Sequence, residues 1–418
     1  MSGGTPPWYS YPPDLTQIHI ETESFGDDIL TPLRRVEVGE VTVDTPTVAI
    51  DIKKTRKHES VQENARGVNE LHRSVNGQTL TKALRGDDDA IVKDLQRGYN
   101  KTREDELTIA FISYKPTTPL SEAEARYLCD VIASFSDVVT IPLMPELAQT
   151  VDSDNGTSDP AFRSYVESVK TFLEVAGRST PEMPIMGVIP ILGHQYTTEL
   201  MDLYGRKQVR AFCLDFNRTR ITAKAKVDII RPMMSAIARR GIEESVLFYG
   251  INLAPGDRDE SLGGRPAADF AGVGMGLDII GGSHVSPRMP PSAFEDAEGE
   301  SGEDTITFRL FDKDEWMYHD IPLDELPEAF PEDSSLDAEH VVKRCRRSPK
   351  NALNRLQKIV NAEQKALAAK ELYPEIEGGN LIDHLSGKEG VTVSTSASLQ
   401  EVRRDFESEL KQAGLDDF

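Results

Sequence analysis

Short apolar runs that do not alternate with polar residues recur between residues 45 and 280, and they constrain the fold more than any other feature. They lie at 45–51, 107–114, 138–144, 185–192, 209–216, 246–253 and 273–280. Amphipathic segments of helical length separate several of them, at 121–135, 162–175 and 223–240. Continuous apolar runs between helices are typical of a parallel sheet that is buried on both faces.

Seven such strands are one short of the number that closes a (β/α)8 barrel, so a TIM-like barrel is the predicted fold. The missing strand would lie within 60–104 or be irregular, although residues 52–104 are polar and predict a largely helical excursion. An open doubly wound sheet is the alternative. The first run is not followed by the Gly-x-Gly-x-x-Gly motif that would support this alternative.

Changes in composition predict the domain boundaries. We expect a flexible leader at 1–24, the barrel with an N-terminal hairpin at 25–290, an acidic linker at 291–304, a C-terminal hairpin and helical subdomain at 305–385, and a tail at 386–418 with a terminal helix at 398–413. The first hairpin is predicted because alternating valines flank Gly39. The linker is predicted because its acidic residues are mixed with Gly and Ser.

The charge of the chain restricts its partners. It carries 70 acidic and 47 basic residues, a net charge of −23 that is spread along the whole sequence. This balance is typical of a halophilic protein, and an ordinary acidic cytosolic protein is the alternative. It argues against nonspecific binding of nucleic acid by the whole surface. Three distant cysteines, no apolar run long enough to span a membrane and no signal peptide predict a cytoplasmic protein.

Polar residues at the predicted strand ends are the candidate site, because reactive side chains of a barrel gather at that face. They are Asp51, Glu146, Asp215, Asn252, Asp278 and His284, together with Gly281 and Gly282. Carboxylates there suit acid–base or nucleophilic catalysis, and helix capping or solvent exposure is the alternative. Asp215 and Asp278 lie within apolar runs, where an unpaired carboxylate is costly.

The glycine pair and the histidine each have two interpretations. Gly281 and Gly282 would let a planar ligand approach the backbone, or they would form a plain tight turn. His284 would act as an acid–base residue, or it would be an exposed loop histidine. The sequence predicts no bound metal, because paired cysteine spacings are absent and Cys345 has only His340 nearby.

One basic cluster contrasts with the acidic chain. It comprises Lys343, Arg344, Arg346, Arg347 and Lys350 and continues to Arg355 and Lys358. A cluster of this kind suggests a nucleic-acid backbone as partner. The alternative is a helix face that forms ion pairs with the acidic residues of the same chain.

Five segments carry a family resemblance. They are 25–46, which ends in Val-Asp-Thr-Pro, 136–143, 274–280, 359–363 and 375–381. In these segments the chain resembles the tRNA-guanine transglycosylase superfamily, including its archaeosine and DNA 7-deazapurine branches. The resemblance implies a β/α barrel that replaces guanine in tRNA or DNA by a 7-deazapurine, and it allows a homodimer.

The resemblance also implies a double displacement in which one carboxylate attacks the sugar and another exchanges protons with the base. With a register shifted by three residues the nucleophile would be Asp278, and the acid–base residue would be Asp51 or Asp215; otherwise the enzyme is altered or inactive. The chain lacks the family's Asp-Ser-Gly-Gly signature, its nucleophile position falls on Gly281 in an ungapped alignment, and its zinc cysteines are reduced to Cys345. No cofactor is therefore expected. The alternatives are a nucleic-acid-binding or assembly protein that has lost the chemistry, and a barrel enzyme that acts on a small molecule.

Overall fold

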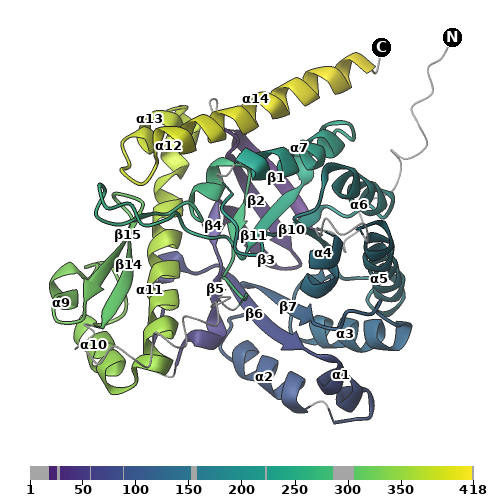
Figure 1. Ribbon diagram of the computed structural model, residues 1–418, viewed down its shortest axis with the longest axis horizontal. Coiled ribbons are helices and arrows are strands. Elements are labelled where there is room, and N and C mark those ends of the chain that lie inside the picture. Colours follow the sequence, from purple (N-terminus) through teal and green to yellow (C-terminus); the bar gives the residue numbers. More distant parts are fainter. Residues whose placement is uncertain are drawn as a thin grey trace.

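Parallel strands form the centre of the protein, and helices cover them on the outside (Figure 1). The computed structural model describes residues 18–25, 29–56, 58–87, 89–151, 158–221, 224–285 and 306–416. The largest sheet has the order β4-β13-β11-β10-β9-β8. Its strands are β4 (Thr47–Val48), β8 (Val139–Thr140), β9 (Ile185–Pro190), β10 (Ala211–Asp215), β11 (Leu247–Ile251) and β13 (Ile279–Ile280).

A second parallel sheet is connected to both edge strands of the first, β4 and β8. It contains β5 (Ile50–Asp51), β6 (Val68–Val75) and β7 (Leu107–Tyr114). Ala49 alone separates β4 from β5, and the parallel bridges Ile109–Val138 and Ser113–Leu143 join β7 to the segment around β8. The expectation that one strand lies within 60–104 is confirmed by β6.

The apolar runs form strands that are shorter than predicted. β7 is the exception, because it spans 107–114 and every residue in it is buried. The run 273–280 contributes only the two residues of β13, since Ala271–Gly274 forms the 3-10 helix η4. The predicted helical excursion 52–104 contains β6 as well as α1 (Gly77–Leu84) and α2 (Asp89–Tyr99).

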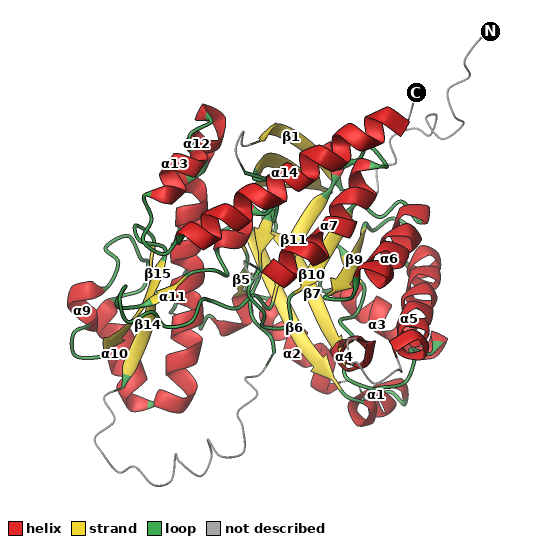
Figure 2. Cartoon of the chain, turned by 45° about the horizontal axis from the view of Figure 1, so that its top comes forward, coloured by secondary structure: helices red, strands yellow, loops and turns green. Residues whose placement is uncertain are grey.

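Helices that follow the strands cover their outer side (Figure 2). They are α3 (Glu122–Ser134), α4 (Pro145–Val151), α5 (Ser158–Ser179), α6 (His194–Arg206) and α7 (Lys224–Ala238). α3 begins at the predicted residue, because Ser121 and Glu124 form a reciprocal capping box. Among the described helices, none is both long and apolar enough to cross a membrane.

The first described part of the chain forms an antiparallel sheet of three strands. It contains β1 (His19–Phe25), β2 (Pro32–Val38) and β3 (Val41–Thr45). The predicted hairpin is confirmed by the pairing of β2 with β3, and Gly39 adopts the left-handed conformation that its turn requires, with φ at +60°. β1 occupies most of the described part of the predicted leader 1–24; residues 1–17 lie outside the described part of the chain.

The C-terminal region consists of a hairpin and helices. β14 (Thr307–Asp312) pairs with β15 (Met317–Pro322), as predicted, and β15 also pairs with β12 (Arg265–Pro266). The helices are α9 (Leu326–Ala329), α10 (Ala338–Arg347), α11 (Pro349–Glu371), α12 (Tyr373–Gly378), α13 (Leu381–Ser386) and α14 (Val393–Asp416). α14 begins five residues before the predicted 398–413 helix and packs on α7. The predicted linker 291–304 lies outside the described residues.

A buried ion pair joins the first sheet to the large parallel sheet. Arg34 Nη1 of β2 lies 2.5 Å from Asp278 Oδ1, and both side chains are almost completely buried. The other carboxylate oxygen of Asp278 accepts a 2.6 Å hydrogen bond from the backbone N–H of Phe248 in β11. Asp278 therefore connects β2, β11 and the start of β13.

We expect Asp278→Ala to lower the free energy of unfolding by about 3–5 kcal/mol, because it breaks the buried ion pair with Arg34 and removes the acceptor of the Phe248 N–H. Urea denaturation at constant KCl concentration measures this change. Asp44→Ala is the matched control, since Asp44 pairs with Arg35 at an exposed position of β3 and its loss should change the midpoint little. Equal effects of the two substitutions would contradict a structural role for the buried pair.

Candidate functional site

Glu70, on β6, is the centre of a buried polar network at the carboxyl ends of the strands. Its side chain is completely buried. Tyr249 Oη donates a 2.6 Å hydrogen bond to Glu70 Oε2, the backbone N–H of Gly282 lies 3.1 Å from Oε1, and His284 Nε2 lies 2.5 Å from Oε1. Burial opposes ionisation, but the His284 ring and these hydrogen bonds hold the pKa of Glu70 below its usual value.

Two histidines stack beside this carboxylate. The rings of His72 and His284 are 4.0 Å apart with an interplanar angle of 14°, and His72 Nε2 lies 2.8 Å from Ser113 Oγ. Burial and the neighbouring His284 lower the pKa of His72 well below 6.5, so this ring is neutral at physiological pH. The predicted loop histidine, His284, is therefore enclosed, with only 5% of its side chain exposed.

Asp51 lies next to Glu70 across the strands β5 and β6. The two residues are direct partners in the parallel register, so their Cα atoms are separated by about the 4.8 Å spacing of neighbouring strands. Burial is the main reason that the pKa of Asp51 is raised. Lys54 Nζ, 3.9 Å from the Asp51 carboxylate, opposes this effect only in part. Two adjacent carboxyl groups therefore have pKa values shifted in opposite directions.

Asp215 and Asn252 hold the loop that carries His284. Asn252 donates a 2.7 Å hydrogen bond to Asp215 Oδ1, and its own amide oxygen accepts hydrogen bonds from the backbone N–H groups of His284 and Val285. Burial raises the pKa of Asp215. Asn252 has a left-handed backbone with φ at +58°, a conformation that concentrates at functional sites when a non-glycine residue adopts it.

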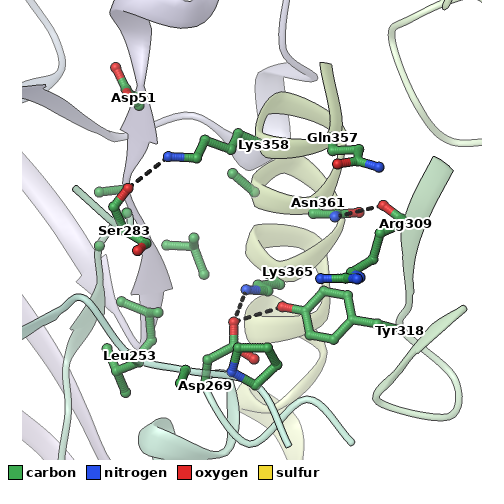
Figure 3. A pocket seen from close by; sticks show the side chains of 18 of the residues that line it. Asp51, Leu253, Asp269, Ser283, Arg309, Tyr318, Gln357, Lys358, Asn361 and Lys365 are labelled. Atoms are coloured by element: carbon green, nitrogen blue, oxygen red, sulfur yellow. Dashed lines mark hydrogen bonds and ion pairs between the residues drawn. The ribbon is translucent and has the colours of Figure 1, made fainter. Parts of the chain in front are cut away.

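A cavity of about 390 Å³ lies between these strand ends and helix α11 (Figure 3). Residues that line it include Asp51, Leu253, Gly281, Gly282, Tyr318 and Lys358. Its volume lies within the range of about 300–1,000 Å³ that is usual for small-molecule sites. Asp269 lies at the far end in Figure 3, where it accepts hydrogen bonds from Tyr318 and Lys365.

The structure brings most of the predicted strand-end residues together. Asp51, Gly281 and Gly282 line the cavity, and the Asn252 side chain links Asp215 to the backbone of His284, which lies between the lining residues Ser283 and Val285. No room exists for a side chain at Gly281, because a Cβ there would collide with the Glu70 carboxylate and the Tyr249 ring. The group that approaches the backbone of Gly281 closely is therefore the Glu70 carboxylate of the same chain.

Two predicted residues lie elsewhere. Asp278 precedes β13 at the opposite end of the strands, five positions before the level of Asp51 in register, or about 16 Å at a strand rise of about 3.3 Å per residue. Its carboxylate is engaged by Arg34 and Phe248. Glu146 lies in the first turn of α4, 44% exposed, 3.9 Å from Lys115 Nζ and outside the cavity lining.

The predicted basic cluster divides between two faces. Lys343, Arg346 and Arg347 are exposed on α10, where Arg346 forms an ion pair with Asp324, and Arg344 is half-buried. Lys350 lies in α11, and its side chain is outside the described part of the structure. Arg355 turns inward to the buried Glu59, and Lys358 points into the cavity.

Sequence reasoning missed Glu70, His72, Tyr249 and the cavity-facing side of α11. The strand Val68–Val75 contains mostly polar residues, so the sequence shows no apolar run there that would have predicted the strand or its inward-facing residues. A usable signal exists in α11, where Asn354, Gln357, Lys358, Asn361 and Lys365 recur at helical spacing and line the cavity.

The structure contains one group of side chains whose donor atoms could converge on a metal, within the part of the chain that it describes. Asp312, Glu315 and His319 have ligand atoms within 4.8 Å of one another at the β14–β15 hairpin. His319 already lies 2.8 Å from Glu315, and Asp312 accepts two backbone N–H groups of its own turn. Cys345 is not part of this group, and burial raises the pKa of its thiol to about 11.

No family model matches the chain, and no curated protein matches it either.

The neutral state of His72 predicts a pH dependence of stability. The pKa of His72 is lower in the folded than in the unfolded chain, so protons bind the unfolded state more tightly. The contribution of the His72 ring to the free energy of unfolding is therefore present above about pH 6.5 and is lost as the pH falls. In urea denaturation, the stability difference between the wild type and His72→Gln should decrease by up to about 1.4 kcal/mol per pH unit below pH 6.5. A stability difference between the two proteins that is constant between pH 5 and 8 would contradict the lowered pKa of His72.

Proposed function

We propose that this chain is a transglycosylase-like enzyme that exchanges guanine in a nucleic acid for a 7-deazapurine at the strand-end cavity. The observation that carries the proposal is the pair of adjacent carboxyl groups, Asp51 and Glu70, with opposite pKa shifts. Such a pair supplies a proton donor and an ionised carboxylate, the two groups that glycosyl transfer between a sugar and a base requires.

The proposal includes a closed (β/α)8 barrel. The pairings run from β4 through β13, β11, β10, β9 and β8, and the bridges to β7 lead through β6 back to β5. In barrels of this type the active site lies at the carboxyl ends of the strands, which is where Asp51 ends β5 and where Gly281 and Gly282, after β13, line the cavity.

Asp51 is assigned as the acid–base residue and Glu70 as the nucleophile. Asp51 gives its proton to the leaving guanine while the Glu70 carboxylate attacks C1′ and the glycosidic bond breaks. The incoming base then returns a proton to Asp51 and displaces Glu70 from C1′. His284 covers Glu70, so the ring must turn aside for the attack.

The assignment moves the nucleophile away from Asp278. Asp278 is held by Arg34 at the opposite end of the strands, whereas Glu70 occupies the space that a side chain at Gly281 would fill. A carboxylate from β6 thus lies where the resemblance places one from the segment after β13. This coincidence supports a relocated nucleophile, and a single substitution tests it.

One observation favours a second candidate function. Glu70 is completely enclosed, and its two oxygens are already engaged by Tyr249, Gly282 and His284. A carboxylate in this state stabilises the interior and cannot attack without rearrangement. The second candidate is therefore a protein that binds nucleic acid or a purine base at the cavity without exchanging it.

Guanine exchange decides between these two functions. We expect the wild type to incorporate labelled 7-deazapurine into tRNA or duplex DNA in molar KCl, and Asp51→Asn or Glu70→Gln to reduce the rate at least about 100-fold, as for loss of a catalytic acid–base group. Asp130→Asn on the exposed surface of α3 is the matched control and should retain full activity. Binding of either polymer by the wild type without any exchange would support the second candidate.

The exposed cations of α10 are the proposed contact with the nucleic-acid backbone. Replacing Lys343, Arg346 and Arg347 together by Gln should weaken binding of every sequence alike and reduce the slope of log affinity against log salt by up to about one for each lost phosphate contact. Fluorescence anisotropy across a KCl series measures both quantities. The control replaces the exposed Lys82, Lys170 and Lys207, and an equal loss there would contradict a specific role for α10.

A further inference from the structure

Two cations that line the cavity interact with backbone carbonyls. Lys358 Nζ, from α11, donates a 2.7 Å hydrogen bond to the carbonyl of Ser283, as Figure 3 shows. Arg218, in the loop after β10, donates a 3.3 Å hydrogen bond to the carbonyl of Val285. Both residues line the cavity. Within the described ranges, neither has a carboxylate oxygen within 4.0 Å, whereas Lys365 at the far end is paired with Asp269.

The position of Lys358 is costly without an anion. Its ammonium group is largely withdrawn from water, and burial is the first cause of its lowered pKa. A carbonyl oxygen compensates less than a carboxylate would, because it carries no full charge. Asp51 and Glu70 attract this lysine only from beyond ion-pair distance. The fold thus keeps a cation in the cavity lining that has no carboxylate at ion-pair distance among the described residues.

The loop that carries Arg218 is held in an unusual backbone conformation. Asn217 and Arg218 are consecutive left-handed residues, with φ at +43° and +61°, and neither is a glycine. Two hydrogen bonds fix them, from the Asn217 N–H to Asp215 Oδ1 and from the Arg218 N–H to the carbonyl of Asn252. Strain of this kind persists where the surroundings enforce it, and it tends to mark ligand sites. Arg218 contacts the same loop, 283–285, that Lys358 also contacts.

We propose that Lys358 and Arg218 form a phosphate-binding subsite beside the cavity, so that the ligand enters as a nucleotide unit whose phosphate is held at residues 283–285. A guanidinium and an ammonium that contact one loop can each donate hydrogen bonds to a phosphate after giving up a backbone carbonyl. The base and sugar then extend into the cavity toward Asp51. This inference rests on the proposed function and assigns its substrate to a phosphate-bearing nucleotide rather than to a free base or nucleoside.

The experiment compares guanosine with guanosine 5′-monophosphate by isothermal titration calorimetry at one KCl concentration. We expect the wild type to bind the monophosphate at least about tenfold more tightly, the factor that one charge-assisted hydrogen bond provides. Lys358→Gln and Arg218→Gln should each remove most of this preference and leave guanosine binding unchanged. Inorganic phosphate should compete with the monophosphate but not with guanosine.

Matched variants keep the test decisive. Lys170→Gln, at an exposed position of α5, should retain the full preference for the monophosphate. Arg218 is exposed, so Arg218→Gln remains informative even if the partly buried Lys358→Gln fails to fold. Equal affinity of the wild type for the two ligands, no binding of either, or an unchanged preference in Arg218→Gln would overturn the proposal.

The outcomes separate this inference from the proposed function. A monophosphate preference that depends on Arg218 and Lys358, in a protein that exchanges no base, would leave the phosphate subsite in place and remove the enzymatic function. Base exchange that depends on Asp51, without any preference for the monophosphate, would support the enzyme and overturn the subsite.

Discussion

An ionised carboxylate can remain in the interior of a protein only when donors surround it, and the architecture at the carboxyl ends of the strands follows from this requirement at Glu70. Tyr249 reaches it from β11, the backbone of Gly282 from the loop after β13, and His284 from the same loop. Meeting the requirement fixes the positions of three chain segments at once. His72, which stacks on His284, and Asn252, which accepts a hydrogen bond from the His284 backbone, complete this network beside the cavity.

A second buried carboxylate, Asp278, organises the opposite end of the same strands. It differs from Glu70 in its partners, because Asp278 is paired with the guanidinium of Arg34, whereas Glu70 is held by a phenol, a backbone N–H and an imidazole ring. The two buried carboxylates therefore hold different segments of the chain at two levels of the parallel strands.

The positions of most parallel strands and of the first hairpin could be predicted from the sequence, because both depend on local patterns of apolar residues. β7 agrees with its predicted run, and Ser121 begins α3 as expected. The sequence placed β6 only somewhere within 60–104, because the buried Asn69 and Glu70 interrupt the apolar run and have partners far along the chain. It located Asp51 and His284 through their places after predicted strands. It could not separate Asp278 from them, because an acid inside an apolar run is compatible with either end of a strand.

The absence of space at Gly281 also restricts how this chain could change by mutation. An aspartate introduced there would meet the Glu70 carboxylate and the Tyr249 ring, so two like charges and a steric collision would arise together. Shortening Glu70 first would instead leave Tyr249 and His284 without their shared acceptor. Each single step therefore passes through a destabilised protein, and the two positions can exchange their roles only through coupled substitutions. The glycine and the glutamate are thus sterically coupled, although 210 positions of sequence lie between them.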